Sequence, residues 1–178
     1  DISDLKMTII TNDPTKRYYY TLLFGDKYRV KIATRNVNIP GIQNFRDLGG
    51  YPSYPGKKQM RWGMIYRSAE IDSLEYCSRR ELKNLGIKTL IDLRTPSEIG
   101  RQSPLQKGFN VVHIPLATGD MEDILQGIRE EKIKCDTVYR MVERMNRTLI
   151  DKYTKEYRQI FDILLDKTNY PVVIHCSS

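Results

Sequence analysis

The chain has 178 residues, enough for one ordinary domain with a small extension, and its 40% apolar and 29% charged content is typical of a globular protein. It contains no run of about 18 apolar residues, which excludes a transmembrane helix within this sequence. The net charge of +7 favours anionic partners, but the basic residues form no block typical of a nucleic-acid-binding tail, so we expect no nucleic acid.

The three cysteines, Cys77, Cys135 and Cys176, form no Cys-x-x-Cys pair, and the chain has only two histidines. This composition argues against a zinc site, and we expect neither a metal nor a cofactor. An odd number of cysteines leaves at least one thiol free unless it pairs with another chain. The sequence starts at Asp1 without a methionine or a signal-like stretch, so a cytoplasmic and a secreted soluble protein both remain open.

The N-terminal region is predicted to be a β meander. Residues 17–24 and 28–33 are rich in aromatic and β-branched residues, and the second run alternates apolar and polar side chains. Gly25, Asp26 and Lys27 between them are typical of a hairpin connection. Residues 5–10 are expected to add a third strand.

Helices are predicted from capping signals and from apolar periodicity. Residues 78–81 and 95–98 each match a capping box, and the helix that starts at the first of them is expected to end near Gly86. Two longer helices follow, and we expect their apolar stripes to pack in the core. The stripes are Val138, Met141, Val142, Met145 and Leu149, and then Tyr157, Ile160, Phe161, Leu164 and Leu165.

Short apolar runs between these helices predict strands over residues 88–93, 110–114 and 172–174. Strands that alternate with helices indicate a largely parallel sheet covered on both faces. We therefore predict an α/β fold with a mainly parallel central sheet flanked by helices. The antiparallel β extension would occupy residues 1–35, and the α/β domain residues 36–178.

The carboxyl ends of these strands carry polar residues. Asp92 and Arg94 lie at the end of the first strand, His113 at the end of the second, and His175 and Cys176 at the end of the third. Ligands of open α/β sheets lie just beyond the carboxyl ends of the strands. If the three strands are neighbours, an acid, a cation and a thiol converge on one crevice.

Cys176 followed by Ser177 and Ser178 is suited to phosphate chemistry. Converging backbone N–H groups in a loop stabilise a thiolate and also bind phosphate oxygens, and small residues allow close approach. The thiolate could then attack phosphorus without a metal. The alternative is that Cys176 is a buried structural cysteine, since free cysteine is often a small core residue.

Several blocks of the sequence, in order, resemble the bacterial protein tyrosine phosphatase family. The match covers about residues 39–178, and each block alone is weak whereas the ordered series is highly specific. The blocks are Asn44-Phe45-Arg46-Asp47-Leu48-Gly49-Gly50, Ile65-Tyr66-Arg67-Ser68-Ala69-Glu70, Leu85-Gly86-Ile87, Ile91-Asp92-Leu93-Arg94 with Glu98, and Val173-Ile174-His175-Cys176.

The resemblance implies a cysteine-phosphatase fold in which Cys176 is the nucleophile. It implies that His175 holds the catalytic loop and that Ser177 and Ser178 begin the phosphate cradle. In the family the loop usually continues through a Lys-Asp-Arg run that supplies a general acid and a phosphate-binding arginine. The sequence ends before these residues, so we expect an incomplete domain that is not a competent phosphatase unless the remainder exists elsewhere.

Other residues have two interpretations each. Asp120 could swing toward the crevice as the general acid or be a solvated loop residue. Asp92 and Arg94 could line the phosphate site or pin the loop through hydrogen bonds. Three further residues are expected to brace the scaffold rather than touch substrate: Arg46, Asp47 and Arg67.

Three functional hypotheses follow from this sequence. The favoured one is a protein tyrosine phosphatase acting through a phosphocysteine intermediate, with breadth toward phosphoserine, phosphothreonine or phosphoinositides. Its partners would be phosphorylated proteins or phosphoinositides, and phosphate- or sulfate-like anions would bind the same site. The alternatives are a catalytically inactive pseudophosphatase that binds phosphorylated partners and a rhodanese-like sulfurtransferase.

Overall fold

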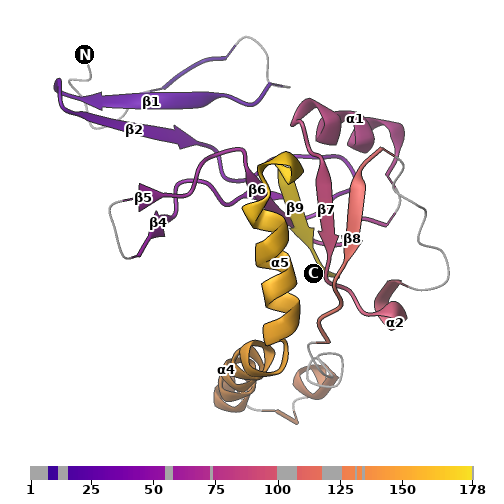
Figure 1. Ribbon diagram of the computed structural model, residues 1–178. Helices are drawn as coiled ribbons and strands as arrows, with labels where there is room; N and C mark the ends of the chain where they lie inside the picture. Colours follow the sequence, from indigo (N-terminus) through magenta and orange to yellow (C-terminus); the bar gives the residue numbers. More distant parts are fainter. Residues whose placement is uncertain are drawn as a thin grey trace.

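The computed structural model describes residues 8–11, 16–54, 58–72, 74–99, 108–117, 126–130, 132–133 and 135–177. Its centre is a five-stranded sheet with the strand order β3-β6-β9-β7-β8 (Figure 1). All neighbours pair in parallel except β3, which pairs antiparallel with β6 at one edge. The expected α/β architecture with a mainly parallel sheet is confirmed. The strands are β3 (Arg46–Asp47), β6 (Ile65–Ser68), β7 (Thr89–Asp92), β8 (Asn110–His113) and β9 (Val172–His175).

Both faces of the sheet are covered by apolar side chains, as the predicted strand pattern requires. On one face, Leu82 of helix α1 (Tyr76–Asn84) packs in a cluster with Leu90 and Val173. On the other face, Ile160 of helix α5 (Thr154–Leu165) packs with Ile91 and Val172. Adjacent residues of β7 and β9 therefore serve opposite faces. All of β7 is buried, and β9 is buried except for the half-buried Ile174.

The first predicted capping box is wrong in its position. Helix α1 begins at Tyr76 after Glu75, and Ser78 lies inside it, where its buried hydroxyl donates to the Pro40 carbonyl at 2.6 Å. The end of the helix is confirmed, because Gly86 adopts a φ of 73° after the last turn. The amide of Ile87 donates to the Leu82 carbonyl at 3.0 Å, which is the bond of a Schellman motif.

The N-terminal region is a hairpin of two strands, β1 (Tyr19–Phe24) and β2 (Tyr28–Ala33), joined by a turn at 25–27 as predicted. It projects from the body of the protein (Figure 1). The expected third strand is not found over residues 8–10, and the rest of that segment lies outside the described residues. A second small hairpin pairs β4 (Pro52–Ser53) with β5 (Lys58–Gln59). Whether residues 1–35 are an independent unit stays a prediction.

Asp47 attaches the first hairpin to the body. Its fully buried carboxylate accepts hydrogen bonds from the amides of Gly49 and Gly63 and from Arg17, which precedes β1, at 2.7–2.8 Å. Trp62 adds a bond from its indole N–H to the Lys31 carbonyl. The bracing role predicted for Asp47 is therefore confirmed.

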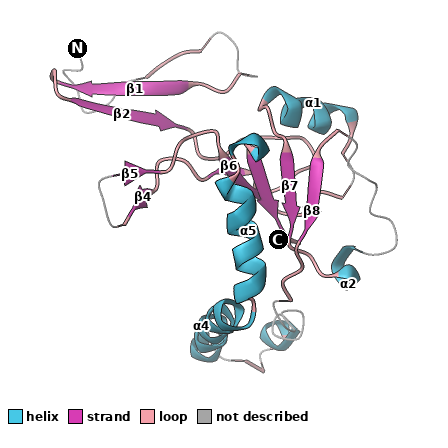
Figure 2. Cartoon of the chain, viewed as in Figure 1, coloured by secondary structure: helices cyan, strands magenta, loops and turns pink. Residues whose placement is uncertain are grey.

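The two long helices are present where the apolar stripes predict them. On helix α5 the stripe is buried against the sheet at Ile160 only, and the expectation of core packing is wrong for Phe161 and Leu165, which are exposed at the surface. A 3₁₀ turn η1 (Lys167–Asn169) then leads into β9. Helix α4 (Cys135–Lys152) differs from the expectation, because every residue of its stripe from Val138 to Leu149 is only half-buried. Figure 2 shows α4 at the far end of α5, away from the sheet. No helix in the described ranges is long and apolar enough to span a membrane.

Candidate active site

Three strands that carry polar residues end side by side. Asp92 of β7 lies in register with His175 of β9 on one side and with His113 of β8 on the other, and all three strands run in parallel. The carboxyl ends of β7, β8 and β9 therefore meet at one edge of the sheet, where Figure 1 marks the C-terminus. The prediction that the three strands are neighbours is confirmed, and their polar ends lie where open α/β sheets bind ligands.

Cys176 lies directly beyond the central strand at this edge. Its side chain is half-buried and its thiol is free, whereas Val172 and Val173 of the same strand are fully buried. The carbonyl of the preceding His175 accepts a hydrogen bond of 2.9 Å from the amide of Leu93. The thiol thus stands on a rigid strand but outside the apolar core, which suits a reactive cysteine better than a packing residue.

Arg94 lies under this edge as a fully buried cation. Its guanidinium donates to both oxygens of Asp92 at 2.9–3.3 Å, and also to Asp72. Burial acts to raise the pKa of the Asp92 carboxyl, but the hydrogen bonds from Arg94 outweigh it and hold this pKa below its usual range. His113 adds a bond of 2.5 Å from its ring nitrogen Nε2 to the Arg94 carbonyl. The four residues form one connected network.

His175 is buried beside this network without a close partner. It is 1% exposed, and its Nδ1 lies 3.8 Å from the nearer oxygen of Asp92. Neither ring nitrogen has a hydrogen-bond partner within the part of the chain that the structure describes. Burial lowers the pKa of His175 to about 4, so the imidazole is neutral at neutral pH.

The lowered pKa of His175 predicts acid sensitivity between pH 6.5 and pH 4. In this window the histidine of the unfolded chain binds a proton and the folded one does not, so stability falls as the pH falls. Between pH 7 and pH 5 we expect a loss of roughly 2 kcal/mol in the free energy of unfolding from this group. The His175→Asn variant should lack this part of the loss when urea unfolding is compared at the two values. An equal loss in both proteins would contradict the assignment.

Ser177 is tied to the second predicted capping box. Its hydroxyl donates to Oε1 of Glu98 at 2.6 Å, between residues 79 positions apart. The other oxygen of Glu98 accepts from the amide and the hydroxyl of Thr95, each at 2.7 Å, so this capping box is confirmed at the start of α2 (Pro96–Ile99). Burial acts to raise the pKa of Glu98, but the bonds from Ser177 and Thr95 lower it on balance, which keeps the carboxylate ionised.

Two residues at this edge were missed by sequence reasoning as site residues. Glu98 carries a signal in hindsight, since it ends a capping box that follows a strand of the predicted crevice. Asp72 carries none, because it lies in an irregular segment far from Arg94 in sequence. Asp120 and Ser178 lie outside the described residues. No cluster of three or more potential metal-ligating side chains occurs in the described ranges.

A model of the tyrosine phosphatase family matches residues 37–178. The triple specificity protein phosphatase PtpB of Mycobacterium tuberculosis is similar to this chain, with 33% identity over 90 residues. The alignment covers 48% of this chain and 31% of that protein, so the chain spans only about a third of its relative's length.

Proposed function

The chain belongs to the tyrosine phosphatase family, and from this premise we propose that the intact protein that contains it hydrolyses phosphotyrosine through a phosphocysteine intermediate on Cys176. The observation that supports this proposal is a free, half-buried thiol at the carboxyl end of the central strand, between parallel neighbours. Hydrolysis of para-nitrophenyl phosphate by the intact protein, with mass-spectrometric detection of phosphate on Cys176 after rapid acid quench, is the direct test.

The proposed reaction has two steps. The Cys176 thiolate attacks phosphorus, so that an S–P bond forms while the bond from phosphorus to the phenolic oxygen breaks, and an acid gives its proton to that oxygen. Water then attacks the phosphocysteine, the S–P bond breaks, and inorganic phosphate leaves with the thiolate regenerated. Ser177 and Ser178 are proposed to begin the phosphate cradle. Asp120 stays a proposed proton donor.

We assign Asp92 and Arg94 to positioning rather than to phosphate binding. Every nitrogen of the Arg94 guanidinium already donates to a carboxylate of Asp92 or Asp72, and the group is fully buried. Such a network ties the end of β7 to Asp72, which follows β6, and to His113 at the end of β8. The neutral His175 is proposed to hold the cysteine loop as a hydrogen-bonding group, because it brings no positive charge at neutral pH.

Breadth toward other phosphomonoesters is part of the proposal. The similar mycobacterial protein is named as a triple specificity phosphatase, and we extend to this chain the possibility of phosphoserine, phosphothreonine and phosphoinositide substrates. The two alternatives are separable in the same assay. Phosphopeptide binding without turnover supports a pseudophosphatase, and a persulfide on Cys176 after thiosulfate treatment supports a sulfurtransferase.

Glu98 is proposed to position the cysteine loop through Ser177. A net hydrogen bond of ~1 kcal/mol corresponds to about a fivefold effect, so Glu98→Ala should lower kcat/KM for an aryl phosphate by about that factor. Thr95→Val is the matched control, because it removes the Thr95 hydroxyl that donates to Glu98 and leaves the bond between Glu98 and Ser177 intact. If both variants lose activity equally, the effect comes from helix α2 and not from the contact with Ser177.

A further inference from the structure

Two arginines face each other on neighbouring strands at the edge of the sheet. Arg46 of β3 lies directly opposite Arg67 of β6 in the antiparallel pair, so both side chains leave the sheet on the same face. Both residues are exposed, while their neighbours Asp47 and Tyr66 are buried on the other face. Two positive charges therefore lie on neighbouring strands, exposed to water, on the β3 side of the sheet.

This arrangement does not serve the stability of the sheet. Like charges directly opposite each other in an antiparallel pair are destabilising. Two other arginines of the chain are compensated by carboxylates: Arg17 pairs with Asp47, and Arg94 with Asp72 and Asp92. Neither Arg46 nor Arg67 has an ion pair or a side-chain hydrogen bond among the residues that the structure describes. An anion between the two guanidinium groups would remove their repulsion.

The arginine pair lies close to the candidate nucleophile. Arg67 is in register with Ile174 of the adjacent strand β9. Its backbone is thus one strand spacing of ~4.8 Å to the side of β9, and about two residues or ~7 Å before Cys176 along the strand direction. The Cys176 backbone is thus roughly 8 Å from that of Arg67 and roughly 12 Å from that of Arg46, which is within the ~7–13 Å between residues two to four apart in an extended peptide.

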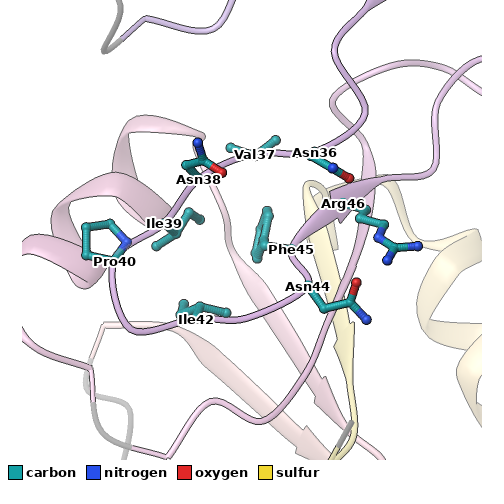
Figure 3. A pocket seen from close by; sticks show the side chains of 9 residues that line it. All are labelled: Asn36, Val37, Asn38, Ile39, Pro40, Ile42, Asn44, Phe45 and Arg46. Atoms are coloured by element: carbon teal, nitrogen blue, oxygen red, sulfur yellow. The ribbon is translucent and has the colours of Figure 1, made fainter.

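Polar groups suited to a peptide lie near Arg46. Asn44 has a left-handed φ of 58°, and Figure 3 shows its amide and the Arg46 guanidinium on the same side of the chain, away from Phe45. Both residues line a hollow of about 400 Å³ whose wall also contains Asn36 and Asn38, and the rest of this wall is apolar. Asparagine amides both donate and accept hydrogen bonds, as a peptide backbone requires. A charged rim with amides next to it fits an acidic peptide segment.

We propose that Arg46 and Arg67 form a subsite for a carboxylate or phosphate of an acidic phosphopeptide, on a residue near the phosphorylated one that reacts at Cys176. This inference rests on the proposed function and deepens it by naming the substrate class. The subsite binds the anionic side chain between the two guanidinium groups. The protein therefore prefers phosphotyrosine with acidic neighbours over phosphotyrosine with neutral neighbours.

The test compares two phosphotyrosine peptides of equal length with the intact protein. One carries Asp and Glu around the phosphotyrosine, and the other carries Asn and Gln at the same positions. We measure kcat/KM for both, and divide each by the rate on para-nitrophenyl phosphate. The Arg46→Gln/Arg67→Gln double variant should lose most of the preference for the acidic peptide, about threefold to fivefold per arginine in 50 mM salt. Arg29→Gln, which removes an exposed charge from the hairpin strand β2, should retain it.

Each outcome bears on the subsite. Loss of the preference in the double variant alone, without a lower melting temperature, supports it. An equal loss in Arg29→Gln shows that the overall field of the +7 chain causes the preference, and overturns the subsite. The subsite is also overturned if the double variant loses activity only toward phosphoinositide in anionic vesicles. If the wild-type protein hydrolyses no phosphomonoester, the proposed function fails; fluorescence anisotropy of the two peptides then measures the preference as binding, and equal affinities overturn the subsite.

Discussion

Replacing Cys176 by serine is expected to abolish hydrolysis of para-nitrophenyl phosphate, with a fall in kcat on the order of 10³-fold or more. The physical reason is the nucleophile itself. A thiol has a substantial thiolate fraction near neutral pH and is intrinsically nucleophilic, whereas a serine hydroxyl stays protonated unless a base activates it. The measurement is the steady-state rate of the intact protein and of its variant at pH 7.

Cys77→Ser is the matched control for this experiment. Cys77 is a second free cysteine, exposed on helix α1 away from the ends of β7 and β9, and its replacement should leave the rate unchanged. A Cys176→Ser variant that is as active as the wild type would refute the phosphocysteine mechanism. A wild type that binds phosphopeptides without turnover would instead favour the pseudophosphatase alternative.

Removing the Arg94 guanidinium should destabilise the protein more than any other single substitution at this edge of the sheet. Arg94→Met leaves the carboxylate of Asp92 buried without its charged partner, and breaking a buried ion pair from one side costs about 3–5 kcal/mol. That is a large share of the 5–15 kcal/mol (roughly) that stabilises a typical domain. Urea denaturation at pH 7 measures the change in the free energy of unfolding.

Two further variants make this prediction specific. Arg80→Gln removes an exposed arginine whose Nε lies 3.4 Å from Glu81, and it should change stability by less than about 0.5 kcal/mol. Adding Asp92→Asn to Arg94→Met removes the uncompensated charge and should recover part of the loss, which keeps the experiment informative if the single variant does not fold. Equal stability of Arg94→Met and the wild type would show that the network is not important for the fold.

The end of the sheet that carries Cys176 could be predicted because its signals are local. The apolar runs that became β7, β8 and β9 and the polar residues at their ends are each visible within a few residues. Parallel pairing then follows from the alternation of strands and helices. The second predicted capping box is also confirmed, since its hydrogen bonds join only Thr95 and Glu98, which are three residues apart.

The sequence predictions were wrong where a contact with a residue distant in sequence determines the structure. Residues 78–81 match a capping box, but the Ser78 hydroxyl donates to the Pro40 carbonyl, and the N-cap is Glu75, three residues earlier. The stripe of helix α4 has the periodicity of a core helix, yet the structure leaves it half-buried. Arg46 was expected to brace the turn with Asp47, and only Asp47 makes the bracing bonds.

The sequence by itself determined the α/β alternation, the strand that presents Cys176 and the family to which these blocks point, because periodicity, turn chemistry and ordered motifs are properties of neighbouring residues. Only the tertiary structure decided which charges meet. Strand order and register brought Asp72 to Arg94, Glu98 to Ser177, and Arg67 opposite Arg46. Register is set by the packing of both sheet faces at once, and no local pattern contains that information.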